Sequence, residues 1–450
     1  MIEYIISEND IDKSTKDATK LLSKILKKAK GANEEVLIKF QKGEYHFYKD
    51  FAESAVCYTS NTDADRFPRK SIAINIDGHK NLTVDGGNSL FVMHGDMMAL
   101  AVRNSENIKF LNFSWDFPCP TVFEMHAVAG GMFHTDYFIP EKSEYEFTKN
   151  KLNWHEKSPI SGEKYWQHVN HCEQWLLVGL DKESGKAMRY PLTQGPMFMI
   201  RKIKRLKDGN LRIYYYKPTP KIQKPGTVFE MCPNKNRDCC GAFIEESKNI
   251  SFENVNVHYM HGFGFLVQMS ENVSFESCRF EPRKGTNRHT ASFADIIHVS
   301  GAKGFIKIQN CNLCNAHDDA INIHGTYTRV KDMINNNTLV LEYVHPQQNG
   351  FCQYHKGDKV IFWQRDTLEG AQNEKEFTVK SVENPLEGKN SIKEMKVTFE
   401  EELPAFLNDS LAGEKKYVAE NVTYTPEVII KNNTISHIPT RGILCTTRKK

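Results

Sequence analysis

The sequence has no long apolar run, no large net charge of either sign and no regular cysteine spacing. A membrane-spanning helix needs roughly 18 or more consecutive apolar residues, and no such run occurs. The net charge of +3 gives no support for nucleic-acid binding, which requires a clustered basic face. The N-terminus lacks the basic segment and apolar run of a signal peptide. As written, the sequence indicates a cytoplasmic protein; a leader removed beforehand would make it periplasmic or secreted.

The eleven cysteines are an odd number, scattered without the spacing of a disulfide scaffold. This favours a reducing compartment or buried free thiols. The pairs Cys311–Cys314 and Cys239–Cys240 resemble halves of metal sites, but no second pair at zinc-ribbon spacing follows. The first pair also lies within a β-strand repeat. We therefore expect no metal and no cofactor.

The chain begins with a helix pattern followed by strand patterns. With 40% apolar and 26% charged residues, 450 residues are enough for two or three domains, or for one elongated repeat fold with insertions. Residues 12–30 carry apolar side chains at helical spacing with lysines on the other face, and Gly31 ends the pattern. Strand patterns follow at 36–40 and 43–47. This order is typical of the start of a right-handed parallel β-helix, where the helix plugs the open end of the coil stack.

From Ile72 onward a short pattern of alternating apolar residues recurs, commonly followed by Asn. The copies that begin at Leu82 and Ile108 are offset by 26 residues, and those at Ile250 and Val273 by 23. The inward residues of such a unit can be buried only by the next coil. A period in the low-to-middle twenties with Asn at the turns predicts a parallel β-helix.

Two long segments interrupt the repeat, one between Trp115 and Cys239 and one between Thr328 and Thr425. Both contain short strand-like runs joined by turns and are too apolar for disordered loops. The predicted fold is all-β: a right-handed parallel β-helix with an N-terminal capping helix and two inserted small antiparallel β-barrel domains. The chain stops within a coil, so we expect either a truncation or a partner that covers this end. The expected divisions are 1–118 (cap and first coils), 119–230 (first barrel), 231–327 (catalytic coils), 328–424 (second barrel) and 425–450 (a further coil).

Three aspartates precede short alternating strands in this repeat. Asp318 and Asp319 stand directly before one strand, and Asp295 lies 24 residues before Asp319. Neighbouring coils lie about 4.8 Å apart, so an offset of 24 puts Asp295 and Asp319 in register with Asp318 beside them. An offset of 122 places Arg441 one coil further, over Asp319. We therefore expect three carboxyl groups to converge at one corner of the coil stack.

Such a cluster suits glycoside hydrolysis. One carboxylic acid protonates the leaving oxygen, and another carboxylate acts on the anomeric carbon or on a water. Neighbouring like charges raise at least one pKa, which favours a protonated acid at neutral pH. A pair that holds one water, facing a third acid, suits an inverting mechanism. Two other interpretations remain open, because adjacent aspartates are common in turns and stacked aspartates can bind Ca²⁺.

Polar residues near the acids are the predicted substrate contacts. Aligning the repeats on three serines, Ser247, Ser270 and Ser300, places four of these residues in one polar column that faces away from the core. A tryptophan in the second insertion is either a sugar platform or a barrel core residue. The predicted contacts are Glu245, Gln268, His298 and Asn322 in the column, with Arg441, His317, His324 and Trp363.

The order of one Asp, a later Asp-Asp pair and then His-Gly is similar to that of the polygalacturonase group of β-helix glycosidases. A fuller set of motifs resembles glycoside hydrolase family 110, the exo-acting α-1,3-galactosidases that remove the terminal galactose of the blood-group-B determinant. The motifs are Glu230–Asp238, His261–Gly264, Ser292–Asp295, His317–Gly325 and Pro439–Leu444.

This resemblance covers most of the chain from about Ile72 onward. It implies a β-helix with two barrel insertions, an inverting mechanism without metal, terminal α-galactosyl glycans as substrates and a homodimer. Carried onto this sequence, it implies Asp318 as the general acid, with Asp295 and Asp319 activating water.

Two other functions compete with an exo-galactosidase. A non-catalytic carbohydrate-binding β-helix would use the same polar column without hydrolysis. A polygalacturonase-like hydrolase or a lyase acting on uronates would need a basic subsite or a Lys or Arg base. The column with His298 and Asn322 provides no such base beside the three aspartates.

Overall fold

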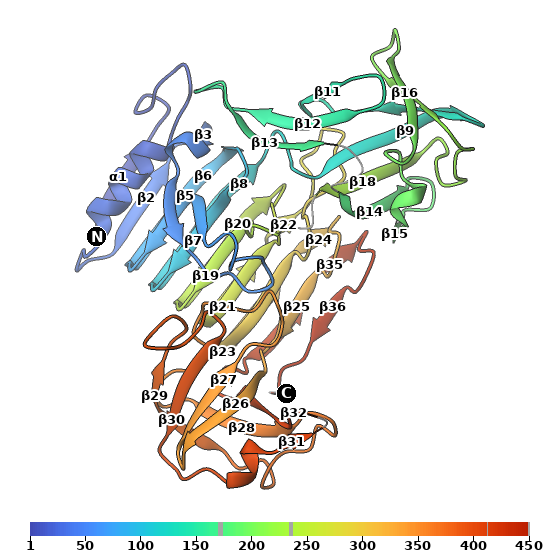
Figure 1. The fold of residues 1–450 in the computed structure, drawn as a ribbon. Coiled ribbons are helices and arrows are strands. Elements are labelled where there is room, and N and C mark those ends of the chain that lie inside the picture. The colour runs from blue at the N-terminus through green and yellow to red at the C-terminus, as the bar shows by residue number, and fades with distance from the viewer. Residues whose placement is uncertain (170–173, 234–236, 412, 449–450) are drawn as a thin grey trace.

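The computed structural model of the chain describes residues 1–169, 174–233, 237–411 and 413–448. Strands dominate these residues, which include one α-helix, α1 (Thr19–Ala29). The largest sheet has 18 strands, and among them only β4 and β5 pair antiparallel. Figure 1 shows these strands stacked one after another from α1 towards β36. A mostly β chain built on a large parallel sheet is therefore confirmed.

This sheet consists of three stacks, because each long strand bends and continues in the next stack. The first stack contains β5 (Arg69–Asp77), β7 (Met98–Arg103), β19 (Ala242–Glu245), the first parts of β21 (Phe265–Glu276) and β23 (Ile297–Gln309), β25 (Ile321–His324) and β36 (Ile443–Cys445). β4 (Glu53–Val56) pairs with β5 at the edge of this first stack.

The second stack contains β1 (Ile2–Ile6), β2 (Val36–Phe40), the first parts of β6 (Lys80–His94), β8 (Glu106–Asp116) and β20 (Lys248–Val257), the second parts of β21 and β23, and β34 (Glu427–Lys431). The third contains β3 (Glu44–Tyr48), the second parts of β6, β8 and β20, then β22 (Arg279–Phe280), β24 (Asn312–Cys314) and β35 (Thr434–Ser436).

The interior of the stacks is filled by residues at the same register position in successive coils. The rings of Phe110, Phe252 and Phe275 stack with centroids 4.7 and 5.2 Å apart. At the corners, asparagines adopt positive φ, which Asn tolerates better than most residues. The amides of the asparagines that directly precede the alternating apolar residues form a hydrogen-bonded ladder. The ladder runs through Asn81, Asn107, Asn249 and Asn272.

The N-terminal helix is shorter than predicted. Asp12 accepts backbone hydrogen bonds from Ser14 and Thr15 and so closes a turn of its own. Lys16 then takes a φ of 53°, which interrupts a helical path, and α1 begins only at Thr19. Its apolar face joins the core of the stacks through Leu22, Ile25, Leu26 and Ala29.

The first insertion forms two sheets in the described residues, where the sequence predicted a barrel. The seven-stranded antiparallel sheet has the order β15-β14-β18-β9-β10-β17-β16. Its edge strands β15 and β16 carry exposed Lys and Arg side chains, which oppose further strand pairing and keep the sheet open. The strands are β9 (Phe123–Gly131), β10 (His134–Phe138), β14 (Gln174–Asp181), β15 (Lys186–Arg189), β16 (Ile200–Arg205), β17 (Leu211–Tyr215) and β18 (Thr227–Pro233), with a three-stranded sheet of β11 (Tyr145–Phe147), β12 (Leu152–Lys157) and β13 (Lys164–Val169).

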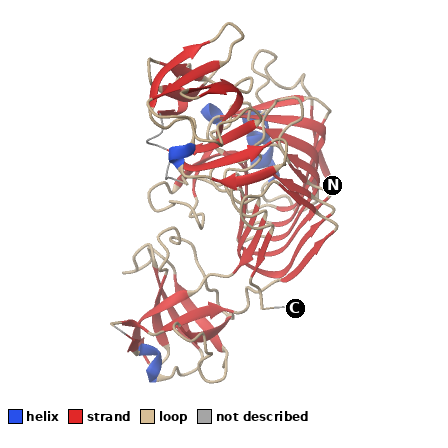
Figure 2. Cartoon of the chain, turned by 90° about the vertical axis from the view of Figure 1, so that its right-hand side faces the viewer, coloured by secondary structure: helices blue, strands red, loops and turns tan. Residues whose placement is uncertain are grey.

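The second insertion forms a closed six-stranded antiparallel barrel, which confirms the small antiparallel barrel predicted there from the sequence. Its order is β26-β27-β30-β29-β28-β33, and a core of its own includes Phe362, Phe377 and Phe399. Figure 2 shows both insertions projecting from the same side of the stacks. Among the described residues, no helix has the length and apolar character needed to cross a membrane. The barrel strands are β26 (Thr328–Asn335), β27 (Thr338–Glu342), β28 (Lys359–Gln364), β29 (Phe377–Glu383), β30 (Glu394–Phe399) and β33 (Tyr417–Asn421), beside the hairpin β31 (Ser410–Leu411) and β32 (Glu414–Lys415); 3₁₀ turns lie at Lys49–Phe51, Leu192–Gln194 and Ala405–Asn408.

Candidate active site

The three predicted acids lie where the chain passes from the third stack to the first. Ile297 pairs with Ile321 and Ile321 with Ile443, which are the predicted offsets of 24 and 122. The backbone N–H of Ile296 donates to the carbonyl of Asp319 at 3.0 Å, so the two aspartate-bearing corners are adjacent. The predicted register of Asp295 and Asp319 is therefore confirmed.

Asp295 is buried beside two polar partners. Its Oδ2 lies 2.7 Å from Nδ1 of His298 and accepts a hydrogen bond from the amide of Asn322 at 3.3 Å. Burial and the Asp319 carboxylate raise the pKa of Asp295 to about 7, against the lowering effect of Arg237. This carboxyl group therefore exchanges its proton near neutral pH.

Asp319 is held by an arginine from the next coil. Arg441 donates from Nε and Nη2 to the two carboxylate oxygens, both at 2.8 Å, while Thr440 donates to Oδ1 at 3.0 Å. The side chain of Asp319 is 1% exposed, and the bidentate guanidinium fixes the orientation of its carboxylate. The amide of Asn322 also donates to Asp319, at 3.3 Å, and so bridges it to Asp295.

Asp318 is the most accessible of the three, with 22% of its side chain exposed. Arg189 of the first insertion lies 3.3 Å from one carboxylate oxygen, and Arg237 lies 3.7 Å from the other. Burial and the nearby Asp295 nevertheless raise the pKa of Asp318 above its usual value. Arg189 also donates to the backbone carbonyl of His317 at 2.6 Å, which fixes the first insertion against this corner.

These groups provide the parts of an acid–base pair. An accessible carboxyl group with a raised pKa can donate a proton, and two buried carboxyl groups that share one amide can hold and polarise a water. The Oδ1 atom of Asn322 is buried and has no hydrogen-bond partner among the described residues. Within that part of the chain, no three His, Cys, Asp or Glu side chains are grouped as a metal site.

His298 connects the acid site to a loop far away in sequence. Burial and Arg237 lower its pKa to about 3, so the ring is neutral and carries one proton. A proton on Nδ1 donates to Asp295, and Nε2 then accepts from the amide of Asn61 at 2.6 Å. His324 lies 2.8 Å from the same Nε2 and is partly exposed. Of the three predicted histidines, His298 therefore contacts Asp295 directly, and His324 reaches the acids through His298.

The predicted polar column is only half correct. Glu245 pairs with Gln268, but Gln268 pairs with Ser300, while His298 pairs with Leu266 and Asn322. Ser270 faces Ala302 and Ser300 faces Gln268, so the serines on which the repeats were aligned do not occupy equivalent positions.

Gln268, which is hydrogen-bonded to Glu245, holds the loop that contains Tyr58 and Ser60. The Gln268 side chain is fully buried, accepts from Ser60 N–H at 2.8 Å and donates to the carbonyl of Tyr58 and to Glu245, each at 3.0 Å. Every polar atom of Gln268 is thus used within the protein. The structure therefore places this predicted substrate contact in the interior, at a position where alternation with core residues was taken for exposure.

His317, another predicted substrate contact, also lies in the interior. Its side chain is fully buried, with Nε2 2.6 Å from Glu230 and Nδ1 2.8 Å from the sulfur of Cys232. Despite the opposing effect of burial, Cys232 and Glu230 raise its pKa well above the usual value. His317 therefore joins the corner to β18.

Trp363 lies in barrel strand β28, and its Nε1 donates to Glu420 at 2.8 Å. Arg448 covers the ring at 5.1 Å. Among the described residues, no contact joins Trp363 to the three acids. The Trp363 ring therefore contacts Glu420 in the barrel and Arg448 beside it.

Three site residues were missed from sequence: Arg189, Arg237 and Asn61. Arg237 lies within the motif Glu230–Asp238, so the family resemblance already pointed to this segment. Arg189 and Asn61 lie outside the strand repeat, and nothing in their local sequence marks them. Asn61 is held by the barrel, since its N–H donates to Gln347 O at 2.9 Å and its side-chain oxygen accepts from Gln348 at 3.3 Å.

Comparison with known proteins gives a consistent result. Residues 338–410 match the family model of the GLAA-B beta-barrel domain II. Alpha-1,3-galactosidase A of Streptomyces avermitilis is 34% identical over 443 residues, which cover 96% of this chain and 69% of that protein. Alpha-1,3-galactosidase A of Bacteroides thetaiotaomicron is 33% identical, covering 97% and 72%. Alpha-1,3-galactosidase B of Parabacteroides distasonis is 32% identical, covering 93% and 65%.

These similarities extend along nearly the whole chain and include the inserted barrel. Identity above 30% over such a length, together with the matching barrel domain, shows the family. The chain belongs to the alpha-1,3-galactosidase A/B family, glycoside hydrolase family 110.

Proposed function

We propose that this protein is an inverting exo-glycosidase that hydrolyses terminal α-1,3-linked galactose from glycans such as the blood-group-B determinant. Family membership supports the reaction and the sugar. The observation that carries the proposal is the convergence of Asp295, Asp318 and Asp319 at one corner, with Asn322 between two of them. Hydrolysis of a glycosidic bond needs such a set of carboxyl groups.

Asp318 is the proposed general acid. It is more exposed than the other two acids, so the leaving oxygen of a bound glycoside can reach it. Its raised pKa keeps a larger share of the group protonated at neutral pH. Arg189 and Arg237 position this carboxyl group and compensate the charge that it acquires after proton transfer.

Asp295 and Asp319 are the proposed activators of water. The shared amide of Asn322 keeps their Oδ2 atoms near one another, which suits them to hold one water molecule. Arg441 holds the carboxylate of Asp319 in place, while Asp295, with a pKa of about 7, accepts the proton of the attacking water. In the inverting mechanism this water reaches the sugar from the face opposite Asp318.

Contacts to the sugar are assigned from accessibility. Arg441 is 56% exposed while still bound to Asp319, and His324 is partly exposed beside His298. Both present polar groups next to the acids. We assign Asn322 the same role because its buried oxygen has no hydrogen-bond partner among the described residues.

The fold and assembly belong to the same proposal. The chain passes repeatedly through the three stacks, which supports a right-handed parallel β-helix capped by α1. The proposed domain divisions lie at residues 118, 230, 327 and 424, at the ends of the two insertions. We further propose a homodimer, as the family resemblance implies.

The test of the acid is Asp318→Asn, which keeps the shape of the side chain and removes its proton. Release of galactose from an α-1,3-galactobiose should fall below detection, whereas Asp366→Asn, an exposed change on the barrel, should leave it unchanged. Near-normal turnover by Asp318→Asn would contradict the assignment. Retention of the glycan by the wild-type protein without any product would favour a non-catalytic carbohydrate-binding protein instead.

A further inference from the structure

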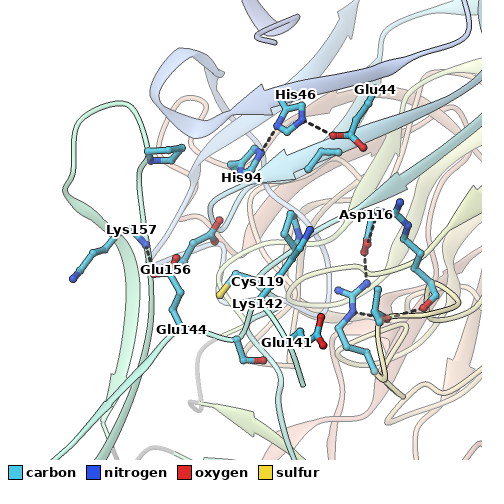
Figure 3. Close-up of a pocket in the computed structure, with 17 residues that line it drawn as sticks. Glu44, His46, His94, Asp116, Cys119, Glu141, Lys142, Glu144, Glu156 and Lys157 are labelled. Carbon is cyan, nitrogen blue, oxygen red and sulfur yellow. Dashed lines mark hydrogen bonds and ion pairs between the residues drawn. The ribbon is translucent and has the colours of Figure 1, made fainter. Parts of the chain in front are cut away.

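A second polar cavity lies away from the three acids. Its volume is about 450 Å³, within the roughly 300–1,000 Å³ typical of small-molecule sites. It is bounded by the outer face of β3, β6 and β8, by the first insertion and by the connection that follows β22. Figure 3 shows side chains from these elements around it, and none of the three aspartates lines it.

One wall is made of flat imidazole and phenol rings. His46 Nδ1 lies 2.8 Å from His94 Nε2, and Glu44 holds the other His46 nitrogen at 3.0 Å. The ring of Tyr48 stacks on His94 at 4.5 Å and fixes its orientation. Burial and His46 lower the pKa of His94 to about 3, so this ring is neutral.

The facing wall carries hydrogen-bonding groups with spare capacity. Arg288 forms a buried pair with Asp116 at 2.6 Å and is fully engaged. Arg283 lies only within 4.0 Å of the same Asp116 and is 40% exposed. Within the described part of the chain, the side chains of Glu141 and Lys142 make no hydrogen bond or ion pair, although both line the cavity.

The charges of the lining balance one another. Burial raises the pKa of Glu156 to about 8, so this group is mostly uncharged at pH 7. The remaining charged groups are four acids and four bases: Glu44, Asp116, Glu141 and Glu144, with Lys142, Lys157, Arg283 and Arg288. A cavity of this kind attracts neither an anion nor a cation strongly, but it offers many donors and acceptors to a neutral ligand.

We propose that this cavity is a second, non-catalytic binding site for a neutral saccharide. Hydroxyl groups both donate and accept, so they can bond to carboxylates and to guanidinium or ammonium groups of the same lining. Val92, Pro118 and Pro159 supply apolar surface for the C–H face of a sugar ring. The site is independent of the proposed hydrolysis, because its walls contain none of the acids.

The experiment titrates the full-length protein with D-galactose, L-fucose, N-acetyl-D-glucosamine and lactose, using saturation-transfer NMR and calorimetry. We expect at least one of these sugars to bind saturably to both the wild-type protein and Asp318→Asn. Its affinity should fall at least tenfold in Arg283→Met and also fall in Lys142→Met. Lys389→Met, a matched change on the exposed barrel surface, should not alter it.

Absence of saturable binding by all four sugars would overturn the proposal, and so would binding that is unaffected by Arg283→Met and Lys142→Met. Tighter binding of galactose 6-phosphate or galactosamine than of galactose would overturn the neutral ligand class. Circular dichroism checks that each variant is folded. If Arg283→Met fails to fold, Lys142→Met decides the outcome, because the Lys142 side chain is exposed and forms no hydrogen bond or ion pair among the described residues.

Discussion

Replacing Asn322 with leucine tests the central pair of the site. Leucine has the same branched side-chain skeleton as asparagine, with bulkier methyl groups in place of the amide oxygen and nitrogen, and cannot donate a hydrogen bond. The amide of Asn322 donates to Asp295 and to Asp319 at 3.3 Å each, so the variant leaves two buried carboxyl groups without their shared donor. We expect Asn322→Leu to change the pH dependence of hydrolysis and not only its maximum.

The size of the change follows from the lost bond. A hydrogen bond to a charged group contributes about 1.5–3 kcal/mol, and the length of 3.3 Å favours the lower value. One pKa unit corresponds to about 1.4 kcal/mol, so the pKa of Asp295 should rise by about one unit from its value of about 7. Because Asp295 must be ionised to accept a proton from water, activity below this pKa should fall about tenfold.

The assay is kcat/KM for galactose release from α-1,3-galactobiose between pH 5 and 9. The acidic limb of the profile should move about one unit to higher pH in Asn322→Leu. As a control, Asn75→Leu removes an amide that donates to the carboxylate of Glu53 at 2.9 Å, on β5 of the same stack. Its profile should match the wild type. An equal loss at every pH, or an unmoved acidic limb, would refute the reasoning.

Two further predictions concern residues that hold the site elements together. His317→Leu leaves Glu230, which is 3% exposed, without its ion-pair partner; we expect a loss of about 3–5 kcal/mol of stability, seen as a lower midpoint in thermal unfolding, with KM unchanged. An altered KM with unchanged stability would make His317 a substrate contact after all. His355 lies 2.9 Å from Glu246 and joins the barrel to the stacks. Burial lowers its pKa, but Asp358 and Glu246 outweigh this effect and raise it to about 9. Its stabilising contribution is therefore complete below about pH 6.5 and is lost as pH rises through 9. His355→Gln should lower the unfolding midpoint more at pH 6 than at pH 9.5, and an equal decrease at both values would contradict the ion pair.

Much of the fold could be predicted from periodicity. A parallel stack buries each coil only against the next, so apolar residues recur at a nearly fixed offset and reveal the register of Ile297, Ile321 and Ile443. The predicted polar column failed because the offset between β21 and β23 is 32 residues, so Ser300 faces Gln268 and not Ser270. The predicted first barrel failed because charged edge strands keep that insertion open.

The candidate site could be predicted only as far as the repeat extends. Asp295, Asp319 and Arg441 lie at matching positions in successive coils, and their proximity follows from the offsets. Arg189 and Asn61 reach the same corner from an insertion and from a loop held by the barrel. Such contacts depend on how separate units pack, and no periodic signal in the sequence records that packing.

The most direct test of the proposed reaction is proton NMR of the galactose first released from an α-1,3-galactobiose by the wild-type protein. An inverting mechanism at Asp295, Asp318 and Asp319 predicts that β-galactose appears first and mutarotates afterwards. Initial release of α-galactose would show retention and contradict the proposed roles of the three acids. Absence of any galactose would contradict hydrolysis itself.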